Sequence, residues 1–381
     1  MKILFVHDHK FRRVGNEIYS PGGLPDEVLA RYSKWFGSII VVGRILEEAE
    51  TKSNYSRIEN PDVCVLDKSD LKELVKEADG LILRLPSLNG YLAAHYARQL
   101  SKPYLVEVVG CTWDAYWNYG AKGKLFALGA FLIMRHYVNK APYAVYVTRD
   151  FLQRRYPCKG RCAAISDVAL DDLDASILTK RLDGMDTIKD KLIIGTAAAV
   201  DVAYKGQEYV IRALPELNKR LGRQTKLEYQ LVGHGNPERL MRVAQACGVA
   251  DQVVFCGTLA HNKVFEWMDK IDIYIQPSLL EGLSRALVEA MSRGLPCVAT
   301  RCGGNPELIE ETYLVSPTFK GIIPGEIGKC VLRLCDSQER KEQAKRNYRE
   351  VQLHYSRDEL NDKRSTFYLD FRRKIQAHIS V

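Results

Sequence analysis

The chain has 381 residues, of which 46% are hydrophobic and 27% are charged, and this composition is typical of a globular protein of up to two domains. Its formal net charge of +8 is modest and spread along the chain without a nucleic-acid-binding motif, so we expect no nucleic-acid partner. No apolar run is long enough to span a bilayer and no signal-peptide pattern opens the chain, so the sequence predicts a cytoplasmic protein.

The first half alternates apolar strand patterns with helical patterns, as a doubly wound α/β domain does. Residues 2–8 form the first predicted strand, a long polar loop follows, and a helix is expected over about 25–36. Further strands are predicted at 38–42, 64–66, 80–83, 104–109 and 144–147. We expect residues 1–170 to form this N-terminal domain and the polar residues 171–190 to form a linker.

A basic apolar segment occupies residues 121–140. Its ten nearly unbroken apolar residues, 125–134, are bracketed by the bases Lys122, Lys124, Arg135, His136 and Lys140. Such a segment is too short to cross a bilayer but can lie in its surface, with the lysines at anionic headgroups. Because apolar residues occur all round the expected helix, we favour a buried core helix, with peripheral contact at the inner face of the membrane as the alternative.

The second domain is predicted at residues 191–354, with its first three strands at 192–199, 227–232 and 253–257. Lys205-Gly206 and then a helix from Gln207 follow the first of these strands. The second strand ends at the pair Gly233 and Gly235, where the lack of side chains would let a ligand approach the backbone.

Residues 271–309 have the pattern strand, loop, helix, strand, loop, helix. The expected strands end at Gln276 and Thr300, the helices start near Gly282 and at Pro306, and the first helix has Leu283, Leu287, Ala290 and Met291 on one face. Ligands of a parallel sheet bind at the carboxyl ends of its strands, where both loops lie.

The start of the first of these helices suits a phosphate, because its backbone amides are free and its dipole is positive there. Glu281 and Glu289 are eight residues apart, which would place both on roughly one helix face. Their carboxylates could accept hydrogen bonds from sugar hydroxyls. A nucleotide sugar has hydroxyls at both ends and a charged diphosphate between them.

The run PSLLEG-x3-ALVEAM-x2-GLPCVAT-x2-GG resembles the donor-binding signature of glycosyltransferase family 4, the retaining GT-B enzymes, of the bacterial polysaccharide type. Glu281 and Glu289 match its E-x7-E spacing. The resemblance implies two doubly wound Rossmann-like domains that face each other across a cleft, the first binding the acceptor and the second the donor. Residues 355–381 resemble the closing helix of this fold, which crosses back to the first domain.

The resemblance also implies roles in the second domain. Glu281 would bond the donor sugar, Lys205 the diphosphate and Glu289 the ribose, and Lys205 and the helix start would stabilise the leaving group without a metal or other cofactor. Other expected donor contacts are Gly282, Leu283, Ser284, Arg285, Gly233, Gly235, Thr258 and Leu259. Family members usually carry an arginine about six residues before the lysine, but Ala199 is near that place here.

In the first domain, Gly22 and Gly23 match the glycine loop that approaches the donor phosphate and the acceptor. Val109 stands where many members carry a histidine that meets the donor sugar. The side chains expected to contact donor sugar or acceptor are His7, Asp8, Arg84 and Asp114.

The expected function is therefore transfer of a hexosyl group, with retention, from a nucleotide-diphosphate sugar to a saccharide or lipid-linked saccharide in polysaccharide or glycan biosynthesis. Two alternatives stay open. A non-catalytic nucleotide-sugar-binding subunit would explain the missing arginine and histidine. An epimerase or hydrolase on the same fold would need acid and base side chains in the first domain, and no such pair is evident.

Overall fold

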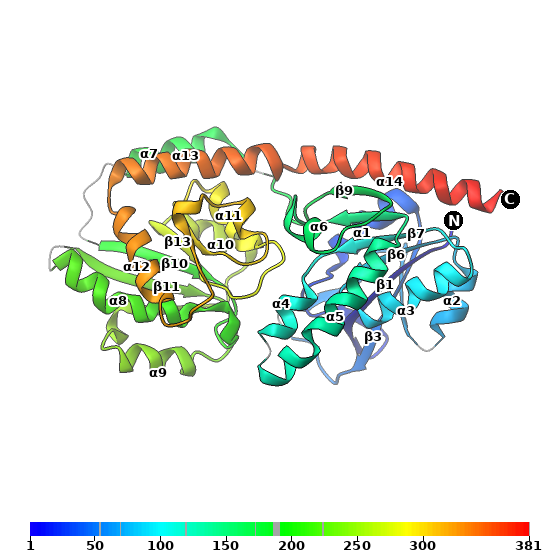
Figure 1. The fold of residues 1–381 in the computed structure, drawn as a ribbon, viewed down its shortest axis with the longest axis horizontal. Coiled ribbons are helices and arrows are strands. Elements are labelled where there is room, and N and C mark those ends of the chain that lie inside the picture. The colour runs from blue at the N-terminus through cyan, green and yellow to red at the C-terminus, as the bar shows by residue number, and fades with distance from the viewer. Residues whose placement is uncertain are drawn as a thin grey trace. The chain divides into compact units, whose positions relative to one another are not determined.

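The computed structural model describes residues 1–52, 55–68, 70–118, 120–171, 173–185, 191–222 and 225–380. The chain divides into two compact units: unit 1 contains Met1–Ile165 and Asn361–Val381, and unit 2 contains Ser166–Leu360. Each unit has its own β-sheet with helices packed around it (Figure 1). The predicted α/β class with two doubly wound domains is confirmed.

Unit 1 is built on a sheet whose central strands are parallel. Its strands are β1 Ile3–Val14, β2 Glu17–Ser20, β3 Ile39–Glu47, β4 Ser56–Arg57, β5 Val63–Asp67, β6 Gly80–Leu85, β7 Tyr104–Val108, β8 Tyr143–Tyr146 and β9 Arg161–Ala164. Within its Met1–Ile165 segment the helices are α1 Asp26–Phe36, α2 Leu71–Glu77, α3 Leu88–Gln99, α4 Thr112–Trp117, α5 Ala121–Asn139 and α6 Phe151–Arg155. The predicted strands and the helix at 25–36 are confirmed, apart from their ends.

The prediction of a polar loop directly after residue 8 is wrong. Strand β1 continues to Val14, and a turn at Gly15 connects it to the antiparallel strand β2. Phe11 is fully buried, while Arg12 and Arg13 pair with Glu48 and Glu47 beside the neighbouring strand. Phe11 is the only apolar residue among residues 7–13, so the sequence shows no strand alternation there.

The α5 helix is not the buried core helix that the sequence favoured. Its buried residues are Gly123, Ala127, Met134 and Val138, which form one narrow stripe. Large apolar side chains on the rest of its surface are exposed. None of the described helices is long and apolar enough to cross a membrane.

Unit 2 contains a fully parallel sheet in the order β12-β11-β10-β13-β14-β15. The strands are β10 Lys191–Ala197, β11 Lys226–Val232, β12 Val253–Gly257, β13 Ile273–Gln276, β14 Cys297–Thr300 and β15 Leu314–Val315. The helices that follow them are α8 Gln207–Leu221, α9 Glu238–Ala246, α10 His261–Met268, α11 Arg285–Ser292, α12 Ile323–Arg333 and α13 Ser337–His354. Strand β13 is buried along its whole length, as its apolar pattern predicts.

The linker expected at 171–190 is wrong for much of its length, because helix α7, Ala175–Gly184, belongs to unit 2 and lies along α13 (Figure 1). The Arg181 guanidinium fastens it by donating hydrogen bonds to the carbonyls of Met268, Ile271 and Arg293. These carbonyls are about 90 to 110 residues away in the sequence, so local composition cannot indicate them. Residues 172 and 186–190 of the expected linker lie outside the described residues.

The helix expected from Pro306 is only one 3-10 turn, Asn305–Glu307, because the next strand already begins at Leu314. The C-terminal helix is present as α14, Arg357–Ile379. From residue 361 onward it packs with unit 1, burying Tyr368, Phe371 and Ile375. The expected return of the C-terminal helix to the first domain is thus observed.

Candidate active site

A lysine–glutamate pair stands at the carboxyl ends of two neighbouring parallel strands in unit 2. Lys205 ends the short turn Ala203–Lys205 after β10, and Glu281 follows β13. The Lys205 Nζ donates to Glu281 Oε1 at 2.8 Å, and both side chains are largely shielded from solvent. The two residues expected to be catalytic therefore lie in direct contact, although 76 residues separate them in the sequence.

Gln276, the last residue of β13, holds the Glu281 carboxylate in place. Its Nε2 donates to Glu281 Oε1 at 3.1 Å and to Ser278 Oγ at 2.8 Å, while its Oε1 accepts from Tyr274 at 2.7 Å. The buried Tyr274, Gln276 and Ser278 thus form a hydrogen-bond network that orients the Glu281 carboxylate. Sequence reasoning missed Gln276, and the available signal was a polar side chain at the end of an apolar strand.

Gly206 allows the Lys205 turn to approach the end of β13. Its φ is 73°, in the left-handed region, and a Cβ there would overlap the Pro277 carbonyl oxygen. The adjoining Leu279 N–H donates to the Tyr204 carbonyl at 2.7 Å. The contact between Lys205 and Glu281 thus depends on a residue without a side chain at position 206.

We expect Gly206→Ala to weaken nucleotide-sugar binding by about tenfold or more, because the added methyl group must push the Lys205 turn away from β13. Gly222→Ala at the other end of α8 is the matched control, since Gly222 also has a positive φ, of 70°, but open space around it. Calorimetric titration of both variants with donor measures the effect. Equal affinity in the two variants would show that the close approach at position 206 is unimportant.

The loop after Glu281 differs from the prediction, because α11 begins at Arg285 rather than at Gly282. Gly282 and Leu283 lie in the loop, and the Gly282 carbonyl accepts from the N–H of Gly304 at 2.7 Å. Ser284 is buried and caps α11 by accepting from the Leu287 N–H at 3.4 Å. Glu281 is therefore not part of the helix, so the expected shared helix face with Glu289 is wrong. Arg285 is exposed at the first helical position.

Glu289 lies inside α11 and is only 5% exposed, yet its Oε1 is 3.1 Å from His261 Nε2. His261 begins α10 directly after the loop that contains Thr258 and Leu259. Thr258 is exposed at this edge, whereas Leu259 packs against the core. The expected ribose ligand, Glu289, thus lies close to the loop of the expected donor contacts Thr258 and Leu259. His261 was missed by sequence reasoning, because its partner is 28 residues away.

The space beside the Gly233 and Gly235 backbones is occupied by protein, which differs from the expected opening for a ligand. A Cβ at Gly233 would overlap the Ala198 carbonyl, and one at Gly235 would overlap the Asp201 carboxylate. These glycines therefore let the loops after β10 and β11 approach each other. At the place of the missing arginine, the Ala199 carbonyl accepts from Gln207 Nε2 at 2.9 Å.

In unit 1, Asp8 caps a helix. Its carboxylate accepts from the N–H groups of Leu88 at 2.5 Å and Asn89 at 3.1 Å, at the start of α3. His7 is adjacent, and its Nδ1 is buried without a hydrogen-bond partner in the part of the chain that the structure describes. Burial, then the charges of Arg84 and His9, lower the pKa of His7 to about 4. The His7 ring is therefore neutral near pH 7.

The loop of Gly22 and Gly23 lies beside His9, whose ring is 3.8 Å from a Cβ built on Gly23. His9 Nε2 and Ser20 Oγ are 2.8 Å apart, and Ser20 Oγ donates to the Gly22 carbonyl at 3.1 Å. Burial, followed by the Arg12 and Arg84 charges, lowers the pKa of His9 to about 4. The residue that lies beside the glycine loop is therefore His9, which sequence reasoning missed.

The other two expected substrate contacts have protein partners. Arg84 donates to Glu107 at 3.1 Å, and Asp114 accepts from Arg155 at 3.0 Å. Val109 extends the sheet by donating its N–H to the Leu85 carbonyl at 2.9 Å. Arg84 and Asp114 therefore have clear structural roles.

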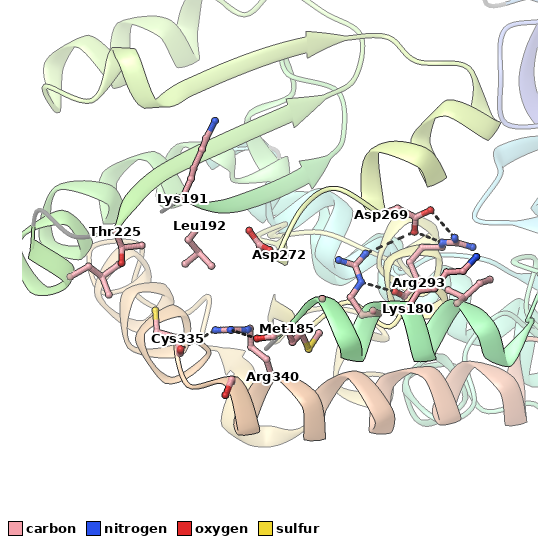
Figure 2. A pocket seen from close by; sticks show the side chains of 15 residues that line it. Lys180, Met185, Lys191, Leu192, Thr225, Asp269, Asp272, Arg293, Cys335 and Arg340 are labelled. Atoms are coloured by element: carbon pink, nitrogen blue, oxygen red, sulfur yellow. Dashed lines mark hydrogen bonds and ion pairs between the residues drawn. The ribbon is translucent and has the colours of Figure 1, made fainter. Parts of the chain in front are cut away.

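A pocket of about 570 Å³ lies in unit 2 at the opposite edge of the sheet, near the amino ends of β10 and β13 (Figure 2). Lys191, Asp272 and Arg340 line it. Arg340 is already bound to the carbonyls of Leu334 and Cys335. This pocket is separate from the Lys205–Glu281 edge, and we do not assign the donor to it.

Two units, each built on a sheet whose central strands are parallel, are the architecture of the GT-B fold of glycosyltransferases. Solved structures support this class. A sucrose-phosphate synthase from Thermosynechococcus elongatus matches with a TM-score of 0.66 at 16% identity, over 98% of this chain and all of that one. Anabaena Alr3699/HepE, solved with UDP, matches with a TM-score of 0.64 at 18% identity, over the full length of both chains.

The profile described as "Glycosyl transferases group 1" matches residues 191–335. Protein CapJ of Staphylococcus aureus is 31% identical over 336 residues, which cover 83% of each chain. The chain belongs to the glycosyl transferases group 1 family. It is accordingly a glycosyltransferase that uses a nucleotide sugar.

Proposed function

We propose that this protein transfers a hexosyl group from a nucleotide-diphosphate sugar to a hydroxyl of a saccharide or lipid-linked saccharide, with retention of the anomeric configuration, in capsule or related polysaccharide biosynthesis. The observation that carries the proposal is the contact between Lys205 and Glu281 at the carboxyl edge of the unit 2 sheet. Similarity to a protein named CapJ supports the polysaccharide assignment. The UDP in the HepE structure supports a nucleotide donor.

The Lys205–Glu281 pair has the chemistry to hold both ends of the bond that breaks. The lysine ammonium has three donor hydrogens, so it can keep Glu281 and also bind a phosphate oxygen. A sugar attached to that phosphate then presents its hydroxyls to the carboxylate, which accepts their hydrogen bonds. Because Glu281, itself held by Gln276, already positions Lys205, little reorganisation of the lysine is needed when charge develops on the leaving diphosphate.

In this proposal Lys205 and the start of α11 carry the electrostatic stabilisation, and the reaction requires no metal. The departing phosphate oxygen takes the proton of the acceptor hydroxyl, so no side chain is assigned as general base. In unit 1 the neutral His7 ring and the Gly22–Gly23 loop are the proposed contacts of the acceptor.

Glu289→Ala is expected to weaken nucleotide binding by about tenfold or more, since hydrogen bonds from ribose hydroxyls to a buried carboxylate are lost. Titration with UDP-, GDP-, ADP- and dTDP-sugars measures the loss and identifies the preferred nucleotide. Glu266→Ala is the matched control, because Glu266 is exposed and pairs only locally with Lys263. A Glu289→Ala variant with wild-type affinity for the preferred donor would contradict the ribose assignment.

Turnover separates this function from the alternatives. A transferase releases nucleotide only when an acceptor is present, and nuclear magnetic resonance of the product then shows the same anomeric configuration as the donor. A changed sugar without acceptor would identify an epimerase, nucleotide release without acceptor a hydrolase, and binding without any turnover a binding subunit. An inverted linkage would contradict retention while leaving the transferase assignment intact.

A further inference from the structure

Helices α4 and α5 are neighbours in unit 1 (Figure 1). Helix α5 and the end of α4 carry an exposed apolar surface, which we call the α5 face. Its members are Leu125, Phe126, Leu128, Leu132 and Ile133, which are 50 to 79% exposed, together with Trp117. Leu125, Leu128 and Leu132 follow the spacing i, i+3, i+7 and so share one side of the helix. The buried stripe of the same helix packs on unit 1, so the apolar side faces outward.

The charged residues of helix α5 itself have one sign. Helix α5 contains no aspartate or glutamate, and its bases are Lys122, Lys124, Arg135 and His136, with Lys140 following directly. Lys124 Nζ lies 5.1 Å from the centre of the Trp117 ring, which itself stacks on Trp113. Asp114 of the adjacent α4 is already paired with Arg155. The α5 face therefore combines exposed aliphatic side chains, an exposed indole and a helix whose charged residues are all basic.

We infer that the α5 face docks on an anionic lipid surface. Aliphatic side chains of a helix lying in the bilayer plane enter the boundary between headgroups and acyl chains, and the indole takes its preferred interfacial position. The neighbouring lysine and arginine side chains then reach anionic headgroups. The helix does not cross the bilayer, because its other side is part of the unit 1 core.

The charge pattern favours a lipid surface over the other occupants. In a two-fold symmetric dimer each face meets its own copy, so the bases of α5 would oppose like charges. A nucleic acid would place hydrated phosphates against the leucines. An anionic lipid surface offers an apolar phase and negative charge in the same layer.

The inference stands on this surface alone and does not use the donor site. Combined with the proposed function, it places unit 1 where a lipid-linked acceptor is presented. Vesicle binding needs no turnover, so failure of the membrane inference and failure of the proposed function are distinguishable.

The test is co-sedimentation of the full chain with vesicles of phosphatidylcholine alone or with about 30% phosphatidylglycerol. We expect binding to the anionic vesicles that falls with added salt. The triple variant Leu125→Gln, Leu128→Gln, Leu132→Gln should reduce partitioning by about tenfold or more, and so should Lys122→Glu, Lys124→Glu, Arg135→Glu.

Matched controls alter exposed positions of unit 2. Met241→Gln, Val254→Gln, Leu353→Gln and, separately, Lys219→Glu, Lys226→Glu, Lys270→Glu should bind vesicles as the wild type does. Equal losses in the control variants, or no binding by the wild type, would overturn the inference. Sedimentation velocity without lipid provides a second test, because a wild-type dimer that the leucine variant abolishes would identify a second copy as the occupant.

Discussion

Lys205→Ala is expected to lower kcat/KM for sugar transfer by about 10²–10³-fold, the loss typical of removing one preorganised group that stabilises developing charge. The lysine is the cation that the structure places against Glu281, at 2.8 Å, so its removal also leaves a carboxylate facing the incoming diphosphate. Donor affinity should therefore fall together with kcat. Steady-state kinetics with saturating acceptor measure both parameters.

Two further variants sharpen this prediction. Lys219→Ala changes an exposed lysine on α8 and should keep wild-type kinetics. In the double variant Lys205→Ala, Glu281→Gln, donor affinity should recover part of the loss seen in Lys205→Ala, because the uncompensated carboxylate is gone. A Lys205→Ala enzyme within twofold of wild-type kcat/KM would contradict the assigned role.

Glu107→Ala is expected to lower the free energy of unfolding of unit 1 by about 3 kcal/mol, since it breaks a buried ion pair and two further hydrogen bonds. Glu107 is 4% exposed and accepts from Tyr32 at 2.7 Å, from Tyr368 at 2.8 Å and from Arg84 at 3.1 Å. Tyr368 belongs to α14, so this one carboxylate joins the C-terminal helix to strand β7 and helix α1.

Differential scanning calorimetry should show the unit 1 transition of Glu107→Ala lowered by about 6–12 °C. Tyr368→Phe removes only one hydrogen bond and should cost about 1 kcal/mol. Glu77→Ala, which removes an exposed ion pair with Lys2, is the control and should change the transition by less than about 2 °C. An unchanged transition in Glu107→Ala would show that the buried network contributes nothing.

Elements with regular apolar periodicity could be predicted from the sequence. Strands β13 and β14 and helix α11 agree with their patterns within a few residues, because their buried residues produce the apolar periodicity. The second half of β1 could not be predicted, because its outward side chains are charged. Helix α7 could not be predicted either, since the Arg181 hydrogen bonds join it to carbonyls on distant segments.

Some residues of the candidate site could be predicted from the sequence, and others could not. Glu281, Glu289 and Lys205 could be named from the family resemblance, because their spacing within short motifs carries the signal. Gln276 and His261 could not, since each acts through a contact that appears only after folding. The exposure of α5 could not be predicted either, because a short apolar run is compatible with a core helix and with a surface helix. Only the packing of the folded chain distinguishes the two.

Hydrogen–deuterium exchange of the wild-type chain with a saturating nucleotide sugar tests the central claim most directly. If the donor binds at the Lys205–Glu281 edge, backbone protection should appear in peptides covering 203–207 and 281–289 and should be absent from Lys205→Ala at the same donor concentration. Protection confined to peptides from the opposite pocket, such as 177–185, would contradict the donor assignment.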